Sequence, residues 1–276
     1  PTPVPTPKRE MRRGLETLLF MGLDETGTMA DSGTFRNNNF ADFLMLLVID
    51  NENKSFKCVH INRDTMVDVP VLGMGGVYVG TEFLQITYAH TYGSGMKDSC
   101  RNTADAVGTL FGGVNIDNYA SLAMSAIGII NDLVGGVTVT VNEDFSQVDP
   151  DLEMGKTITL NAKQADEYIH RRYDIGDGSN AARMLRQRDY MEKWIEQASE
   201  LFKNDESIID SSLIKLNDYL VTNLTSHQMS KLADVLSEYE NRGITYLEGE
   251  NVKGEIYIEF YPDEAKLREL TEELFY

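Results

Sequence analysis

Short apolar runs alternate along the chain with longer segments whose apolar residues recur at helical spacing, and this alternation restricts the fold most. The strand-like runs are 17–24, 41–50, 56–62, 116–119, 137–141, 244–247 and 255–258. The helix-like segments are 101–111, 121–134, 160–169, 181–203, 211–224, 226–241 and 263–274. Interleaved strands and helices predict an α/β fold with a central mixed β-sheet flanked by helices. No linker interrupts residues 9–276, so we expect a single domain.

The first eight residues have a different composition from the rest. Proline and threonine dominate positions 1–7, which predicts an extended linker over residues 1–8. Such a linker would suit a segment that follows a membrane anchor. The sequence itself contains no run of 18 apolar residues and no signal-peptide pattern.

The charge balance limits the partners that the chain can bind. It carries 44 acidic against 25 basic residues, a net charge of −19, which argues against general binding to nucleic acid or to an anionic membrane. Cys58 and Cys100 are the only cysteines, and one disulfide and two free thiols are both compatible with the sequence. The four histidines are not clustered, so no zinc site is predicted.

Five arginines nevertheless fall between residues 170 and 188. Within this segment, residues 176–180 predict a turn, and Ser179 or Asn180 is a natural N-cap for a helix that begins near Ala181. Guanidinium groups near a helix N-terminus suit a phosphate or pyrophosphate. The alternative is an exposed basic helix start whose arginines pair with nearby acids.

An apolar stripe on the same helix favours the anion site. The stripe consists of Met184, Met191, Ile195, Ala198 and Phe202. It fixes the helix against a core and leaves Arg183 and Gln187, four residues apart, at the edge of the buried face. Arg186 lies beside them, and Arg171 and Arg172 approach from the segment before the turn.

Two aspartates mark the ends of the first two strands. Asp24 follows the run 17–24, and Asp42 begins the run 41–50. A hairpin or near-hairpin would bring them together, and two carboxylates can hold Mg²⁺ when a substrate phosphate supplies further ligands. The alternative is that Asp24 caps a turn, as strand-end aspartates often do.

Five motifs, in order along nearly the whole chain, resemble the LytR-CpsA-Psr family. They are Leu-Phe-Met-Gly-Leu-Asp at 19–24, Ala-Asp at 41–42, Ile-Asn-Arg-Asp-Thr at 61–65, Asp-Leu-Val-Gly-Gly-Val-Thr-Val at 132–139, and Arg183-x-x-Arg186-Gln187. Each motif alone is weak, whereas five in sequence order are specific. Four departures are visible. His170 occupies the first place of the family's usual Arg-x-Arg, and Asn62 replaces a usual proline. Glu25 and Thr26 follow Asp24 where the family often has a basic residue, and Phe40-Ala41-Asp42 stands in place of Arg-Ser-Asp.

This resemblance implies a membrane-anchored phosphotransferase at the outer face of the cytoplasmic membrane of a Gram-positive-type bacterium. Such enzymes move a phosphoglycan, such as teichoic acid or capsule, from an undecaprenyl-pyrophosphate-linked donor to peptidoglycan, usually with Mg²⁺. The implied metal ligands are Asp24 and Asp42. The implied pyrophosphate ligands are Arg63, Arg172, Arg183 and Gln187, with Arg171 and Arg186 as neighbours. Asp64 is expected to orient Arg63 or to act as a base, so the implied catalytic set is Arg63, Asp64, Arg172 and Arg183.

Two alternative functions use the same residues. One is a non-catalytic module that binds polyprenyl phosphate or wall glycan, and the other is a polyprenyl-pyrophosphate hydrolase. For the prenyl tail, the apolar segments 101–111 and 121–134 are candidate slots, although ordinary core packing would explain them equally.

Overall fold

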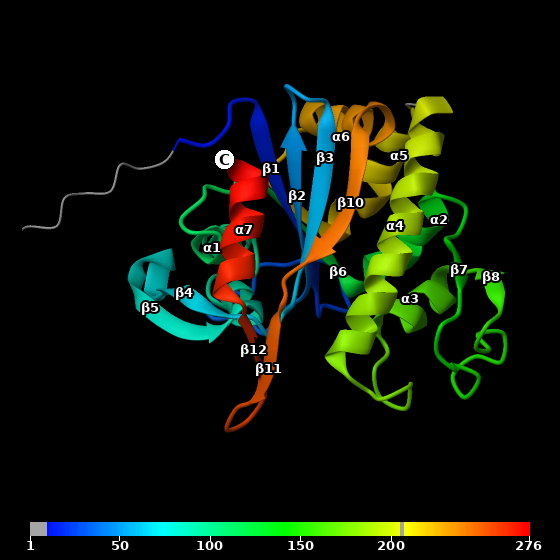
Figure 1. The fold of residues 1–276 in the computed structure, drawn as a ribbon, viewed down its shortest axis with the longest axis horizontal. Helices are drawn as coiled ribbons and strands as arrows, with labels where there is room; N and C mark the ends of the chain where they lie inside the picture. The colour runs from blue at the N-terminus through cyan, green and yellow to red at the C-terminus, as the bar shows by residue number, and fades with distance from the viewer. Residues whose placement is uncertain (1–9, 205–206) are drawn as a thin grey trace, which may run out of the picture.

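A six-stranded mixed sheet organises the fold in the computed structural model, which describes residues 10–204 and 207–276. Its order is β10-β3-β2-β1-β6-β9, and Figure 1 shows β1, β2, β3 and β10 side by side. The strands are β1 (Leu15–Leu23), β2 (Ala41–Asp50), β3 (Ser55–Ile61), β6 (Asn118–Ala123), β9 (Leu220–Thr222) and β10 (Glu240–Tyr246). β1, β2 and β3 are antiparallel neighbours, whereas β6 pairs with β1 and β10 with β3 in parallel. The predicted mixed α/β fold is confirmed.

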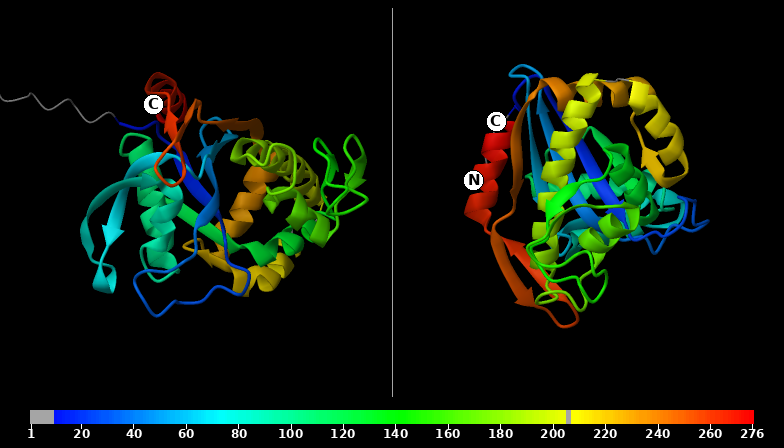
Figure 2. Two further views of the ribbon diagram at one scale, coloured as in Figure 1. Left: turned by 90° about the horizontal axis from the view of Figure 1, so that it is seen from below. Right: turned by 90° about the vertical axis from the view of Figure 1, so that its right-hand side faces the viewer.

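Helices cover both faces of this sheet (Figures 1 and 2). They are α1 (Lys97–Leu110), α2 (Ile127–Leu133), α3 (Ala162–His170), α4 (Asn180–Asn204), α5 (Ser207–Leu216), α6 (Ser226–Glu238) and α7 (Glu264–Phe275). Successive strand residues point to opposite faces, so Leu19 and Met21 pack with α1 and α7, while Leu18 packs with α4 and α6. Two hydrophobic layers therefore enclose the sheet.

Three hairpins extend the molecule beyond the sheet. They are β4 (Met66–Leu72) with β5 (Tyr78–Gln85), β7 (Thr138–Thr140) with β8 (Thr157–Thr159), and β11 (Gly249–Lys253) with β12 (Ile258–Pro262). The first and third lie next to each other, because a parallel bridge joins Thr65 to Phe260. Gln85 reinforces this contact by donating from Nε2 to the carbonyl of Ile258 at 2.7 Å.

Several sequence predictions of element boundaries were wrong. Residues 121–123 belong to β6, and α2 starts only at Ile127, because a fully buried strand is as apolar as a buried helix. The predicted helix 211–224 ends at Leu216 as α5 and continues into β9. The predicted strand at 255–258 is a turn closed by the Gly254 N–H donating to the Tyr257 carbonyl, and β12 begins at Ile258.

Cys58 and Cys100 are both free and buried. Cys58 packs in the layer with α4 and α6, whereas Cys100 packs in the layer with α1 and α7, so the sheet separates them. Burial raises the pKa of each thiol to about 12. The sequence left open one disulfide or two free thiols, and the structure has two free, protonated thiols.

Over the described ranges, none of the helices combines the length and apolarity needed to cross a bilayer. Residues 1–8, predicted as a linker, lie outside the described residues.

Candidate functional site

A β-bulge places Asp42 at the centre of the site. The register of β1 and β2 pairs Gly22 with Phe43 and Leu23 with Ala41, which leaves Asp42 as the extra residue. A bulge bends the strand and redirects the side chain of the extra residue. Here the Asp42 carboxylate forms an ion pair with Arg63, the residue that follows the end of β3 by two positions.

A tight turn after β3 orients Arg63 and Asp64. The Asn62 side chain accepts a hydrogen bond from the Asp64 N–H at 2.9 Å, and the Thr65 hydroxyl donates to the Asn62 carbonyl at 2.6 Å. This turn brings Nε of Arg63 to 3.6 Å from Oδ1 of Asp64. Arg63 therefore contacts a carboxylate on each side, one from β2 and one from its own turn.

The N-terminal turn of α4 supplies the second arginine. Ser179 accepts a hydrogen bond from the Ala182 N–H at 3.1 Å, which confirms it as a capping residue. One turn into the helix, Arg183 is only 7% exposed and lies 3.9 Å from Oδ2 of Asp42. Its Nη2 donates to Asn180 at 2.7 Å, while its Nε has no partner within the described residues.

Asn180 connects the two parts of the site. Its Nδ2 donates to Oδ1 of Asn62 and to Oδ2 of Asp64, each at 3.0 Å, and its oxygen accepts from Arg183. The start of α4 is thereby held against the turn after β3. The structure brings Asp42, Arg63, Asp64 and Arg183, four residues that the family resemblance implies for the site, together from three different elements.

Burial and neighbouring charges both shift the pKa values of the charged groups in this cluster. Burial raises the pKa of Asp64 even though Arg63, Arg183 and Arg172 act in the opposite direction. Burial also lowers the pKa of Arg183, and repulsion from Arg63 and Arg172 adds to that effect. Three guanidinium groups are thus close enough to repel one another, and a bound polyanion would relieve that repulsion.

Arg172 contributes to the site through its charge rather than through a direct contact with the other site residues. Its Nη2 donates to the Tyr173 hydroxyl at 2.9 Å, and its guanidinium lies 5.0 Å from the centre of that ring. Its charge acts on both Asp64 and Arg183. Arg171 instead pairs with Glu167 of α3 at 3.2 Å and is exposed.

Arg186, which was predicted to lie beside Arg183 at the anion site, lies elsewhere. It is 1% exposed and packs 5.0 Å from the ring centre of Phe145. Its Nε donates to the Tyr168 carbonyl at 3.0 Å, and its terminal nitrogens bond the Arg171 carbonyl and the Glu143 carboxylate. Because these partners occupy the guanidinium, the geometry gives Arg186 a structural position.

The second predicted metal ligand lies at the strand end next to Asp42. Asp24 directly follows β1, its N–H donates to the Phe40 carbonyl at 3.0 Å, and its side chain is exposed. Over residues 10–204 and 207–276 no group of three or more histidine, cysteine or acidic side chains forms a metal cage. Two carboxylates from paired strands fit a hard cation only if phosphate and water complete its ligands.

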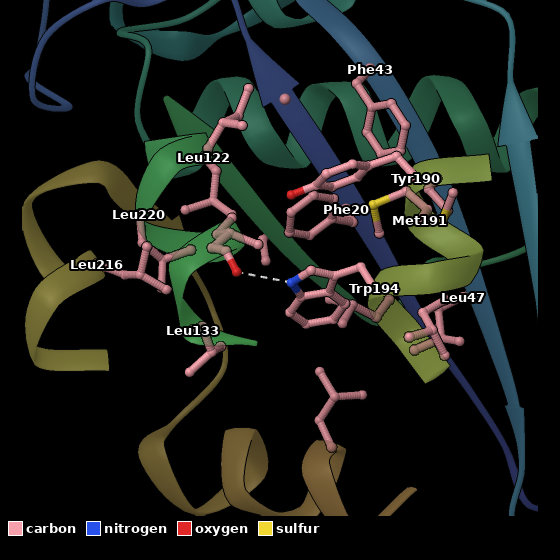
Figure 3. A pocket seen from close by; sticks show the side chains of 18 of the residues that line it. Phe20, Phe43, Leu47, Leu122, Leu133, Tyr190, Met191, Trp194, Leu216 and Leu220 are labelled. Atoms are coloured by element: carbon pink, nitrogen blue, oxygen red, sulfur yellow. Dashed lines mark hydrogen bonds between the residues drawn. The ribbon is translucent and has the colours of Figure 1, made fainter. Parts of the chain in front are cut away.

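An apolar cavity of about 270 Å³ opens behind the charged cluster. It lies between the sheet and the helices α2, α4, α5 and α6 (Figure 3). Its walls include Phe20, Phe43, Leu47, Leu122, Leu133, Tyr190, Met191, Trp194, Leu216 and Leu220. The polar or charged side chains Asp42, His170, Arg183 and Gln187 also line it. The cavity thus joins an apolar interior to the arginine site.

Two helices had been candidates for an apolar slot, and only one lines this cavity. Ile127, Ile130 and Leu133 of α2 belong to its wall, whereas no residue of α1 does. α1 packs on the opposite face of the sheet with α7. Trp194 of α4 faces α2 across the cavity and donates from Nε1 to the Ile130 carbonyl at 3.0 Å (Figure 3). Its indole ring is therefore held in place as part of the wall.

Sequence reasoning overlooked several residues that support the site. Asn62 and Asn180 hold the turn and the helix together, and Gln85 donates to Asp64 at 3.3 Å. Tyr88 shares a hydrogen bond with Tyr257 near Arg63. Asn62 and Asn180 each lie within three residues of a predicted site arginine, and this proximity in the sequence could have indicated their supporting role. No sequence feature marks Gln85 or Tyr88 as part of the site.

Comparison with known proteins identifies the family. The LytR_cpsA_psr family model matches residues 4–275. This chain belongs to the LytR-CpsA-Psr family. Among its relatives, the polyisoprenyl-teichoic acid–peptidoglycan teichoic acid transferase TagU of Enterococcus faecalis is 28% identical over 217 residues, 79% of this chain and 64% of TagU. TagU of Bacillus cereus is 28% identical over 269 residues, 94% of this chain and 77% of that protein.

Solved structures share the LytR-CpsA-Psr fold of this chain. TagT bound to LIIa-WTA superposes with a TM-score of 0.70 at 21% identity, covering 95% of this chain and 90% of TagT. Bacillus subtilis TagV also gives a TM-score of 0.70, at 22% identity, and the match covers 96% of this chain and 97% of TagV. The chain spans 64% of E. faecalis TagU and only 36% of the cell wall biosynthesis protein LcpA of Corynebacterium glutamicum.

Within this family member, His170 ends α3 at the place where an arginine was expected. Its Nδ1 lies 2.6 Å from Oδ1 of Asp166, one helical turn earlier. His170 lines the cavity together with Gln187, whose Nε2 donates to the Ile169 carbonyl at 3.1 Å. The imidazole is thus oriented by a carboxylate and borders the same cavity as Arg183.

Proposed function

We propose that this domain is a cell-envelope phosphotransferase that moves a phosphoglycan from a polyprenyl-pyrophosphate carrier to peptidoglycan. One observation carries the proposal: an apolar cavity is bordered by a buried arginine and a carboxylate, with a second arginine and a second acid beside them. A prenyl tail fits the cavity, and its pyrophosphate fits the guanidinium groups. The TagU relatives, which are named teichoic acid transferases, and the TagT structure with bound LIIa-WTA support the same substrate class.

In this mechanism the arginines stabilise the charge that develops during transfer. Arg63 and Arg183 lie on either side of Asp42 and would hold the non-bridging oxygens of the pyrophosphate, with the Arg172 charge nearby. Fixed cationic donors in a partly buried site stabilise a phosphoryl-transfer transition state without reorganising. Gln187 borders the cavity beside them and would contribute polar contact.

Asp64 would act as the base. It sits beside Arg63, and burial raises its pKa, which makes its carboxylate a better proton acceptor than an ordinary aspartate. It would take the proton of the acceptor hydroxyl while that oxygen bonds to the glycan-linked phosphorus. The bond from this phosphorus to the bridging oxygen breaks, and polyprenyl phosphate leaves with the bond's electron pair.

Magnesium would be held by Asp24 and Asp42, the carboxylates at neighbouring ends of β1 and β2. When bound, it would neutralise part of the pyrophosphate charge. We further propose that the domain works at the outer face of the cytoplasmic membrane, with a membrane anchor outside this sequence, where both the carrier lipid and peptidoglycan are accessible.

A transfer assay tests the proposal. Purified protein is incubated with Mg²⁺, a synthetic prenyl-pyrophosphate-linked disaccharide and a peptidoglycan oligomer, and products are identified by mass spectrometry. We expect a phosphodiester-linked product, and we expect chelation of Mg²⁺ or Arg183→Ala to reduce its formation roughly 10²–10³-fold. Phosphate release without glycan transfer would indicate a hydrolase instead. Lipid that stays bound after chelation, with no turnover, would indicate a binding module.

A further inference from the structure

Two tyrosines lie beside the turn after β3, and the transfer mechanism does not use them. Tyr88 belongs to the 3-10 helix η2 (Ile86–Thr91), and Tyr257 lies in the turn that joins β11 to β12. Their side chains share a hydrogen bond. Figure 1 shows the β11–β12 hairpin projecting beyond the central sheet. The fold thus brings together two phenols that are far apart in the sequence.

Backbone hydrogen bonds fasten both tyrosine-bearing segments to the turn that carries the site residues. The Thr87 N–H, next to Tyr88, donates to the Arg63 carbonyl at 3.1 Å. From the β11–β12 hairpin, the Phe260 N–H donates to the Asp64 carbonyl at 2.8 Å. The tyrosine pair is therefore held at a fixed place beside the arginine and the aspartate of this turn.

The pair offers groups that bind a sugar. Tyr257 is 57% exposed, whereas Tyr88 is half-buried and packs edge-to-face on Phe40 with ring centres 5.2 Å apart. Two phenols that share one hydrogen bond retain one O–H donor and further acceptor lone pairs. The negative face of an aromatic ring also attracts the polarised C–H groups of a pyranose. An exposed ring with hydroxyl groups beside it therefore suits a glycan.

The position of the pair relative to the cavity indicates which glycan it binds. In phosphoryl transfer the attacking and leaving oxygens lie roughly in line, on opposite sides of the phosphorus. Polyprenyl phosphate would leave toward the cavity, which Asp42 and Arg183 border. Arg63 pairs with Asp42, and the two tyrosines, which do not line the cavity, lie beyond Arg63. The acceptor hydroxyl therefore has to approach from the side of Asp64 and the tyrosines.

We propose that Tyr88 and Tyr257 form an acceptor subsite that positions a peptidoglycan sugar with its hydroxyl next to Asp64. This inference rests on the proposed function of the site. A pyranose ring stacks on Tyr257, and a phenol hydroxyl bonds a polar group of the same glycan. These contacts act on the acceptor and not on the prenyl-pyrophosphate donor, so their loss weakens acceptor binding alone.

The experiment measures the two substrates separately. The KM of a peptidoglycan tetrasaccharide with stem peptides is determined at a saturating concentration of a prenyl-pyrophosphate-linked disaccharide. The dissociation constant of that donor is determined by calorimetry without acceptor. We expect Tyr257→Ala to raise the acceptor KM roughly 10-fold through the loss of stacking. Tyr88→Phe removes one hydroxyl and should raise it about 5-fold, and both variants should keep the donor dissociation constant.

Tyr78→Ala is the matched control. Tyr78 is also an exposed hairpin tyrosine, at 62%, but its hydroxyl bonds that of Thr81 within β5. This variant should keep both the acceptor KM and the donor dissociation constant. Circular dichroism of each variant confirms that the fold is retained, as expected for Tyr257, whose side chain lies outside the core.

The outcomes distinguish this inference from the proposed function. If the unmodified protein transfers the glycan but Tyr257→Ala and Tyr88→Phe keep the acceptor KM, the subsite is overturned and the function stands. Weaker donor binding in Tyr257→Ala would assign the pair to the donor glycan and also overturn the inference, as would an equal rise in acceptor KM in Tyr78→Ala. If the unmodified protein neither binds the donor nor transfers the glycan, the proposed function fails and the inference fails with it.

Discussion

Asp42 and Arg183 face each other at the cavity, with Oδ2 of the carboxylate 3.9 Å from Nη1 of the guanidinium. One comes from a bulge in β2 and the other from the first turns of α4. Asp42 also pairs with Arg63, so a single carboxylate lies between two guanidinium groups. Such an arrangement keeps two cations close together and leaves donor capacity for a second anion.

Replacing Arg183 by alanine should slow transfer roughly 10²–10³-fold, because it removes a fixed donor that faces the developing charge. Arg183→Lys should recover only part of the loss, since an ammonium cannot reproduce the planar fork of a guanidinium. The rate is measured with saturating donor and acceptor. Arg188→Gln is the matched control on the same helix, because Arg188 lies 4.4 Å from the centre of the Tyr246 ring and does not line the cavity. Equal losses for both arginines would contradict the special role of Arg183.

The fall in rate on the acid side of the pH–rate profile should result from protonation of Asp64. Burial raises the pKa of this carboxyl above its usual value, and a base works only when deprotonated. Activity should therefore fall as pH decreases through the raised pKa and level off above it. Asp64→Asn should lower the rate roughly 10²–10⁴-fold and remove that pH dependence. Asp68→Asn, at an exposed aspartate of β4, should leave the profile unchanged; a fall on the acid side that survived in Asp64→Asn would assign the base elsewhere.

Trp194 provides an internal reporter of prenyl binding, because it is the only tryptophan in the sequence and lines the cavity. A prenyl chain in the cavity would displace water from around the indole, so we expect fluorescence to shift to shorter wavelength as farnesyl pyrophosphate is added. Inorganic pyrophosphate, which lacks the chain, is the control and should leave the emission maximum in place. The same shift with both ligands would mean that the chain binds outside the cavity.

The residue pattern singled out Asp42 and Arg183, which lie near a strand start and a helix start, and the family resemblance added Arg63. Asp42 begins β2, Arg63 follows β3 and Arg183 lies near the start of α4, and all three meet in the structure. Their convergence depends on strand order and on the bulge at Asp42. Neither is encoded by local periodicity, because a bulge depends on how two strands pair.

Arg186 shows where local spacing is insufficient. It lies three positions after Arg183, which places the two on neighbouring rows of one helix. The segment containing Glu143, Tyr168 and Phe145 packs over only one of these rows, so Arg186 is covered while Arg183 faces the cavity. Which row is covered depends on the path of residues 141–171, and helical periodicity carries no information about that path.

The structural position of Arg186 leads to a prediction about stability rather than binding. Replacing Arg186 by methionine leaves Glu143 and two backbone carbonyls without their partner, and breaking a buried pair costs about 3–5 kcal/mol. The Glu143 side chain is 19% exposed and can be partly hydrated. We therefore expect the free energy of unfolding, measured by urea denaturation, to decrease by the lower end of this range, about 3 kcal/mol. Arg171→Gln, which breaks an exposed pair with Glu167, is the control and should cost at most about 1 kcal/mol. An Arg186→Met protein that unfolds at the unmodified urea midpoint, but no longer binds the prenyl-pyrophosphate donor, would return Arg186 to the anion site.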